Sequence, residues 1–446
     1  ASLRNDEGGA IRIATLVAGL PASKSQQLAV GDQVLKVGQA AEEPTDLTGF
    51  ETEDAVKLIR GKKGTEVRLT LKKADGSIKI VSMIRDEVVL DETYAKSAVI
   101  NEGGKKIGYI FLPEFYADWE RPNGPKCSQD VAKEIIKLKE QAVDGIIMDL
   151  RNNGGGSLYD VVQMVGFFIP DGPIVQVKDR EGNPQVLRDR DRSVLYDGPL
   201  AVMVNEFSAS ASEIFAAAIQ DYGRGIVIGS TSTYGKGTVQ RNIGLEPSTG
   251  LFNKEATDIG TIKLTLQKFY RINGGSTQLK GVTPNIILPD QYESLKYREK
   301  DNPDALPWDE IPRAFYNRIS PGYDMDYVKK TSATRVAANP TFNAIKESSS
   351  LMETASQRVY SLQLIKYREE QKSLRESFKK IEEMNKTTKV MEVKMLELDE
   401  KKLSADNDKL ERRKQWIGNL SKDIYINETC QVISDMIRQV VLVKGN

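Results

Sequence analysis

Three apolar segments, two of which run into helical patterns, constrain the fold of this chain more than any other feature. Residues 145–150 read Gly-Ile-Ile-Met-Asp-Leu, and apolar runs recur at 200–204 and 226–228. Such runs are typical of strands that are buried on both faces of a parallel sheet. Helical patterns follow at 158–168 and from about residue 210 to 219. This alternation of strand and helix predicts a layered βαβ core.

The region before this core has shorter elements. Alternating residues at 10–16 and 67–71 predict strands, and 78–84 predicts the returning strand of a hairpin. Residues 53–60 predict a single helix. We therefore expect a separate first domain at residues 1–88.

The region after the core is charged and helical from about residue 300. A spacing of three and four places Tyr367, Gln371, Leu374, Phe378 and Ile381 on one helix face. This pattern favours a solvated helical layer packed on the core over a coiled-coil interface for a partner.

The length of 446 residues corresponds to roughly three domains. We predict a multidomain α/β protein with domains at 1–88, 89–295 and 296–446. Within the middle domain, residues 262–272 and 278–281 flank Asn-Gly-Gly and predict a β-hairpin.

Composition excludes several classes of chemistry. The chain has no histidine, which rules out a Ser-His-Asp triad, a Cys-His dyad and the common zinc sites that use histidine. Its 63 basic and 63 acidic residues cancel, so net charge gives no reason to expect nucleic acid or a membrane surface as a partner. Cys127 and Cys430 are too few for a disulfide framework, and the sequence leaves open whether they are bridged or free. No apolar run reaches about 18 residues, so we predict no transmembrane helix.

The segment Asn152–Ser157 joins the first apolar strand to its helix and contains three consecutive glycines. Glycine lets the backbone turn tightly and bring N–H groups close to a ligand. A helix N-terminus adds aligned donors that favour an anion or an oxyanion. The sequence alone leaves open whether this segment is such a site or only a tight turn.

The segment Asn205–Glu213 leads from the second apolar strand into a helix and contains Ser208, Ser210 and Ser212. A serine at a strand-to-helix corner is exposed and can act as a nucleophile, although the G-x-S-x-G string is absent. The alternative is that Ser210 caps the helix and Glu213 is its capping-box partner.

Lys236 follows the third apolar strand and lies among glycine and apolar residues. Five residues separate Gly229 from Gly235, and Gly237 follows the lysine, so the spacing of a phosphate loop is not met. A lysine in apolar surroundings can lose its proton near neutral pH and act as a base. The alternative is an ordinary surface lysine in a hairpin. In a chain without histidine, the serine corner, the glycine segment and this lysine together supply the parts of a Ser-Lys hydrolase.

Several segments closely resemble the bacterial tail-specific proteases, which are C-terminal processing peptidases of the Ser-Lys type. These segments are Phe207–Ala218, Asp221–Arg224 and Tyr234–Gln240, and Asp149–Gly156 matches the other signature of the family. Residues 268–278 and 305–309 are similar to the longer, periplasmic branch. The resemblance implies a layered, crotonase-like (Clp-like) protease core with a PDZ domain and a helical C-terminal domain.

The resemblance also implies residue roles. Ser210 matches the nucleophile, Lys236 matches the general base, and Gln240 matches the residue that orients the lysine. The backbone N–H groups of Gly156 and Ala211 match the oxyanion hole. Four further positions match supporting residues of the family: Gly155, Glu213, Asp221 and Thr233.

The first domain looks like the PDZ domain of the family, which binds substrate C-termini by strand addition. We expect Val56 and Ile59 to line its groove and to select apolar C-termini. Its first strand and carboxylate-binding loop are expected before Ala1, so that the domain is shortened at its start. The loop Gly229–Gly235 is one residue longer than is usual, which places the nucleophile and the base 26 positions apart.

We therefore predict an ATP-independent serine endopeptidase that forms an acyl-enzyme on Ser210 and uses no metal or organic cofactor. Its expected partners are polypeptides with apolar C-termini, an adaptor protein is a candidate partner, and nucleic acid is not. The sequence does not decide membrane association. The resemblance implies a periplasmic location, although the chain begins at Ala1 without a signal peptide.

Two other functions are compatible with parts of the sequence. A silent peptide-binding scaffold would use only the PDZ and helical regions, and would lack Ser210 or Lys236. A crotonase-like acyl-transfer enzyme would also use glycine-rich amide loops, but would need neither this residue set nor a PDZ domain.

Overall fold

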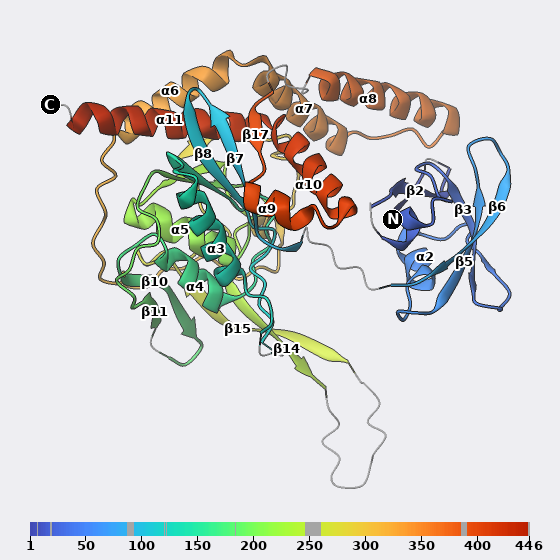
Figure 1. The fold of residues 1–446 in the computed structure, drawn as a ribbon, viewed down its shortest axis with the longest axis horizontal. Helices are drawn as coiled ribbons and strands as arrows, with labels where there is room; N and C mark the ends of the chain where they lie inside the picture. Colours follow the sequence, from blue (N-terminus) through green and yellow to red (C-terminus); the bar gives the residue numbers. More distant parts are fainter. Residues whose placement is uncertain are drawn as a thin grey trace, which may run out of the picture. The chain divides into compact units, whose positions relative to one another are not determined.

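The computed structural model describes residues 1–446 except 7, 18–19, 87–92, 120, 122, 183, 246–259, 385–389 and 445–446. These residues form two compact units, whose elements are labelled in Figure 1. The first unit comprises Ala1–Asp91 and Glu397–Trp416, and the second comprises Glu92–Leu396 and Ile417–Asn446. The candidate nucleophile and the candidate base both lie in the second unit.

The first unit contains an antiparallel sheet with strand order β1-β2-β3-β5-β6, and β4 pairs with β3. Its strands are β1 (Ser2–Asn5), β2 (Ile11–Thr15), β3 (Gln33–Gln39), β4 (Thr45–Asp46), β5 (Glu66–Lys72) and β6 (Ile78–Ile84). Its helices are α1 (Pro21–Lys24), α2 (Thr52–Ile59), α9 (Glu397–Leu403) and most of α10 (Asn407–Leu420). Ala55 of α2 is fully buried in one core with Leu71 and Val81 of the sheet. The predicted helix and strands are therefore present, and β1 and β4 are further strands that the sequence did not predict.

The centre of the second unit is a seven-stranded sheet with the order β16-β13-β12-β9-β8-β7-β17. Its strands are β7 (Lys96–Glu102), β8 (Lys105–Phe111), β9 (Gly145–Asp149), β12 (Leu200–Val204), β13 (Ile226–Gly229), β16 (Ile286–Ile287) and β17 (Glu392–Lys394). The five strands from β16 to β8 are parallel, and β7 and β17 continue the sheet in antiparallel pairs. The three predicted apolar strands are β9, β12 and β13, and they are neighbours that are buried along their whole length. The predicted βαβ core is thus confirmed.

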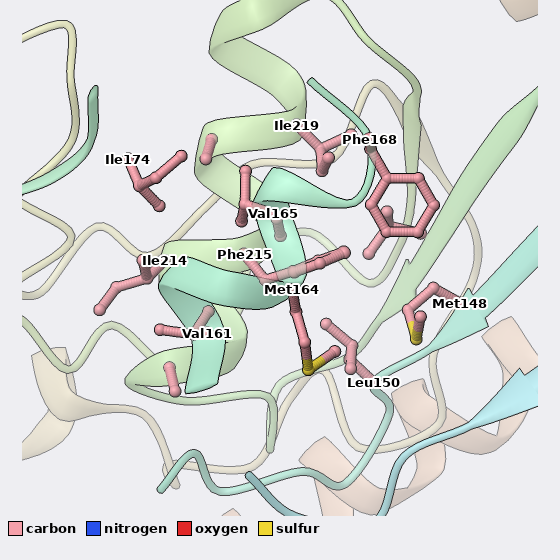
Figure 2. Close-up of a cluster of buried hydrophobic side chains, with 14 of the residues drawn as sticks. Met148, Leu150, Val161, Met164, Val165, Phe168, Ile174, Ile214, Phe215 and Ile219 are labelled. Atoms are coloured by element: carbon pink, nitrogen blue, oxygen red, sulfur yellow. The ribbon is translucent and has the colours of Figure 1, made fainter. Parts of the chain in front are cut away.

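Three helices connect the parallel strands and cover one face of this sheet: α3 (Cys127–Glu140), α4 (Leu158–Gly166) and α5 (Ala211–Tyr222). Figure 2 shows side chains of α4 and α5 gathered with Met148 and Leu150 in one apolar cluster. In this cluster Phe168 and Phe215 make an edge-to-face contact with 5.9 Å between ring centroids. The packing holds α5, which begins next to Ser210, firmly on the sheet.

The C-terminal helix α11 (Ile424–Lys444) packs against the same sheet. A side chain at Gly145 would bring its Cβ within 2.5 Å of Ile433 Cγ2, so α11 approaches β9 where glycine leaves room. The alternate residues Ile146 and Met148 belong to the core under α3, α4 and α5. Because side chains alternate across a strand, α11 covers the opposite face. The helices α6 (Met325–Ala338), α7 (Pro340–Gln357) and α8 (Leu364–Met384) complete this region.

A second sheet has the order β11-β10-β15-β14, and its β14–β15 hairpin extends away from the seven-stranded sheet (Figure 1). Its strands are β10 (Gly172–Asp179), β11 (Gln185–Asp189), β14 (Thr238–Gly244) and β15 (Thr261–Tyr270). The predicted hairpin between 262–272 and 278–281 is wrong, because β15 pairs with β14 and β10. Gln278 is instead buried, and its side-chain oxygen accepts a hydrogen bond of 2.8 Å from the Gly237 amide.

Cys127 and Cys430 are both buried and are not joined by a disulfide, so the open question of a bridge is answered against it. Among the helices that the structure describes, none combines the length and the apolar character needed to cross a bilayer.

Candidate active site

Ser210 lies at the corner between β12 and α5, as its N-cap residue. Its backbone has φ 57° and ψ −112°, a region that residues other than glycine seldom adopt. The side chain is half-buried. An uncommon backbone conformation at a partly exposed serine, beside a helix N-terminus, fits the geometry of a nucleophile corner.

The two neighbouring serines have structural tasks. Ser208 Oγ donates to the Leu150 carbonyl at 2.8 Å and accepts from the Asn205 amide at 2.9 Å. Ser212 Oγ donates to the Asn153 carbonyl at 2.8 Å, and both serines are fully buried. Of the three serines in this segment, only Ser210 therefore presents a partly exposed hydroxyl.

Glu213 joins the serine corner to the lysine loop. Its Oε2 accepts from the Ser210 amide at 2.8 Å and from the Lys236 amide at 2.9 Å. Its Oε1 accepts from the Thr233 hydroxyl at 2.6 Å and from the Gly235 amide at 2.8 Å. Glu213 is completely buried, and burial raises the pKa of its carboxyl to about 7 against the opposing effect of these four donors. One buried carboxyl thus fixes the distance between the two candidate catalytic segments.

The loop that carries Lys236 has further contacts with the same corner. The Tyr234 amide donates to the Ser208 carbonyl at 3.0 Å, and Gly235 adopts a φ of 96°, which glycine tolerates. Lys236 itself is half-buried, and in the described part of the chain its ammonium group makes no hydrogen bond or ion pair. Burial lowers the pKa of Lys236, and the positive charge of Lys263 lowers it further. Both effects favour the neutral amine that a general base requires.

The glycine segment lies directly against the serine corner. A Cβ at Gly155 would come within 2.7 Å of Ser210 Cβ and 3.0 Å of the Ala211 nitrogen. At Gly156 a Cβ would collide with the Phe115 carbonyl, because the Phe115 backbone pairs with this segment. In the part of the chain that the structure describes, neither the Gly156 nor the Ala211 amide donates a hydrogen bond. These two amides are therefore available to stabilise an oxyanion.

The other predicted positions have distinct contacts. Thr233 donates to Glu213, as described, and accepts from the Val282 amide at 2.7 Å. Asp221 forms a bidentate ion pair with Arg271, with distances of 2.6 and 3.1 Å, which ties α5 to the end of β15. Gln240 is exposed on β14, and its Nε2 donates to Thr265 at 3.3 Å rather than to the lysine. Its predicted role in orienting Lys236 stays a prediction.

The predicted peptide-binding residues lie on α2 of the first unit. Ile59 is half-buried against the core of that unit, and Val56 is half-exposed one helical turn before it. Their role in selecting substrates also stays a prediction.

Sequence reasoning missed Asn153, which supports the site from behind. Asn153 is fully buried, its carbonyl accepts from the Ala209 amide at 3.0 Å, and its Oδ1 accepts from the Gly155 amide at 2.9 Å. The available signal was a pair of asparagines before three glycines, at a turn where a side-chain amide can replace backbone partners. The reach of Glu213 to the lysine loop was also missed, since the capping-box pattern accounts only for its bond to Ser210.

Comparison with known families gives one match for each region. Residues 106–288 match the model of peptidase family S41, residues 2–72 that of the PDZ domain, and residues 292–438 that of the C-terminal domain of tail specific protease.

Comparison with individual proteins also finds bacterial proteases. The chain is 41% identical over 349 residues to the tail-specific protease of Haemophilus influenzae, which covers 76% of this chain and 48% of that protein. It is 33% identical over 300 residues to the carboxy-terminal processing protease CtpA of Bacillus subtilis, and the match covers 66% of this chain and 57% of that protein. A solved PDZ domain of a carboxy-terminal protease from Vibrio cholerae, in complex with a peptide, is 37% identical over 20% of this chain and 93% of its own, with a TM-score of 0.19. The chain spans about half the length of the curated relatives it matches.

Replacing Glu213 by glutamine should disrupt the site and destabilise the fold. The glutamine side chain has one acceptor oxygen, and its NH₂ group takes the place of the other carboxyl oxygen. This NH₂ group then faces either the backbone N–H of Gly235 or those of Ser210 and Lys236, so at least one buried N–H group loses its acceptor. That loss costs about 1–3 kcal/mol of unfolding free energy, measurable by denaturant titration, and peptide hydrolysis should fall at least about 100-fold because the nucleophile and the base lose their common anchor.

The pH dependence of stability adds a second measurement on the same variant. Burial raises the folded-state pKa of Glu213 from 4.5 to about 7, so the folded state binds the extra proton in that interval. The stability from this group is present below pH 4.5 and is lost as the pH rises through 7. Glu213→Gln should lack this slope, whereas Glu140→Gln, an exposed position on α3, should keep it and keep full activity. Equal slopes in the two variants would contradict the account.

Proposed function

Because the chain belongs to peptidase family S41, we propose that it is a serine endopeptidase that cleaves polypeptides with a Ser210–Lys236 dyad and recognises their C-termini through its PDZ domain. The reaction needs no ATP. We further propose a periplasmic location, which rests on the family resemblance alone.

A single observation carries the catalytic part of this proposal. Glu213 Oε2 accepts hydrogen bonds from both the Ser210 and the Lys236 amides, so the two nitrogens are no further apart than the sum of 2.8 and 2.9 Å. A nucleophile and a base on different segments must be held in such proximity to react as a pair. A scaffold that only bound peptides would have no need of this arrangement.

In the proposed reaction, the neutral amine of Lys236 takes the proton of the Ser210 hydroxyl as Oγ attacks the scissile carbonyl. The negative charge that develops on the carbonyl oxygen is stabilised by the Gly156 and Ala211 amides. Lys236 then gives its proton to the leaving amine, which leaves an acyl-enzyme on Ser210. Water, activated by Lys236, hydrolyses this ester and restores the free enzyme.

Tail recognition is proposed to use the edge of the first sheet. Within the part of the sheet that the structure describes, β1 pairs only with β2, and α2 contacts β1. An extended C-terminus that adds to the free edge of β1 would therefore lie beside α2, where Val56 is half-exposed. An apolar tail residue fits that position better than a charged one.

Cleavage of an unfolded polypeptide with an apolar C-terminus tests the function. The wild type should cleave the free-acid form, and Ser210→Ala should show no turnover although it still binds the peptide, because only the attacking oxygen is removed. The same substrate with an amidated C-terminus should be cleaved more slowly, as seen in initial rates by mass spectrometry. Turnover by Ser210→Ala would refute the proposed chemistry, and equal rates for acid and amide would refute tail recognition.

The pH–rate profile tests the base. Since burial and Lys263 lower the Lys236 pKa from its ordinary value, kcat/KM should rise with pH along a single limb that lies below the titration of an exposed lysine. Lys236→Arg and Lys236→Ala should both be inactive, because a guanidinium group stays protonated.

A matched control for this profile is Lys263→Gln on β15. It removes a neighbouring positive charge without touching the reacting atoms, so the limb should move to higher pH while the maximal rate is kept. Substantial turnover by Lys236→Arg would rule out lysine as the base.

A further inference from the structure

A cavity of about 410 Å³ lies in the second unit at the carboxyl ends of β9, β12 and β13. Asn152 and Asn205 form part of its wall and bond to each other, with Asn205 Nδ2 donating to Asn152 Oδ1 at 2.8 Å. The cavity is bounded elsewhere by α7 and by the start of α11. None of the candidate catalytic groups lines it. In open α/β sheets the carboxyl ends of parallel strands are where ligands bind.

The walls of this cavity are of two kinds. Ile228, Leu288 and Ile345 give it an apolar side, to which Tyr292 and Tyr425 add aromatic rings. The carboxyl groups of Glu206 and Asp290 lie on another side. A pocket with apolar walls and a few convergent polar groups has the general form of a ligand site.

Glu206 is the unusual member of this set. Its side chain is only 1% exposed, and among the described residues no N–H or hydroxyl donor reaches its carboxyl oxygens, whose hydrogen-bonding neighbour is the Asp290 carboxyl. Burial, and next the neighbouring Asp290 carboxyl, raise the pKa of Glu206 to about 8. A buried carboxyl without a donor is costly, and most such groups in proteins are paired.

The two nearby arginine side chains form ion pairs with other carboxyl groups and not with Glu206. Arg151 bonds to Asp149 at 2.6 Å and to Asp423 at 2.9 Å, so two carboxyls already share its charge. Arg298, whose charge acts on Glu206, has its Nη2 on Glu293 at 2.9 Å.

Lys422 also lines the cavity, but it is exposed to solvent. In the described part of the chain, neither Glu206 nor Asp290 forms an ion pair with lysine or arginine within 4.0 Å. The Asp290 carboxylate therefore has no cationic partner among the described residues at the polar side of the cavity.

We infer that this cavity binds an organic cation with an apolar stem, an alkylammonium group that contacts Asp290 and the Glu206 carboxyl behind it. Two sources carry this chemistry, a free small amine and the lysine side chain of a polypeptide. A metal ion fits less well, because the described residues contain no group of three or more His, Cys, Asp or Glu side chains that could hold one. The stem would lie on Ile228, Leu288 and Ile345, and the tyrosine rings offer cation–π contacts.

Titration calorimetry on the full chain tests this inference with pentylammonium chloride as the probe. Pentylammonium should bind with one site per chain, and 1-pentanol, which has the same stem without the charge, should bind at least about tenfold more weakly. Asp290→Asn should weaken pentylammonium binding by about tenfold or more. Glu206→Gln should weaken it too, and Asp304→Asn, an exposed aspartate of the same unit, should leave it unchanged.

The source of the cation is distinguished with acetyl-Gly-Lys-Gly-amide. Binding of this peptide tighter than that of pentylammonium assigns the cavity to a lysine side chain, and weaker binding assigns it to a small amine. The inference is overturned if 1-pentanol binds as tightly as pentylammonium, if neither amine binds, or if Asp290→Asn, folded by circular dichroism, keeps wild-type affinity. These measurements do not depend on proteolytic activity, so they stand apart from the proposed function.

Discussion

The buried carboxyl of Glu213 is the interaction on which the candidate site depends. Two segments that are separated in sequence, the serine corner and the lysine loop, meet because this group accepts hydrogen bonds from Ser210, Thr233, Gly235 and Lys236. Removing a carboxylate from water is costly unless donors replace its hydration. Here three backbone amides and one hydroxyl replace part of that hydration, and each of them is thereby fixed in position. The hydrogen bonds that stabilise the buried carboxyl therefore also hold the serine corner next to the lysine loop, as a Ser-Lys pair requires.

The sheet explains why these segments meet at one place. Neighbouring parallel strands end on the same side, so the loops after β9, β12 and β13 converge there. The helices α3, α4 and α5 cover one face and α11 covers the other. β17 and α11 therefore belong to the same unit as the candidate site, since β17 extends its sheet and α11 closes it. The cavity beside Glu206 lies at the same strand ends, behind the wall formed by Asn152 and Asn205.

Much of this arrangement could be predicted from the sequence, where local patterns decide it. β12 was predicted with its observed bounds, because a continuous apolar run between turn signals has few other solutions. Ser210 could be singled out as a corner residue, and the capping-box alternative is compatible with it, since the Ser210 amide does bond to Glu213.

The remaining features depend on contacts between distant residues. The bonds from Glu213 to Gly235 and Lys236 span 22 and 23 positions, and the pairing of β17 with β7 brings Glu392 to Asn101. The hairpin beyond β15 was mispredicted for the same reason, because Gln278 bonds to Gly237, 41 positions away. No local period encodes such contacts.

The central claim is that Ser210, and neither of its neighbouring serines, is the nucleophile. Reaction with a serine-directed phosphonate, followed by peptide mapping by mass spectrometry, tests it most directly. Ser208 and Ser212 are buried and donate their hydroxyls to backbone carbonyls, whereas Ser210 is partly exposed beside the Gly156 and Ala211 amides, which donate no hydrogen bond within the described residues. The account predicts a single adduct on Ser210 that Ser210→Ala abolishes. An adduct on Ser208 or Ser212 would contradict it.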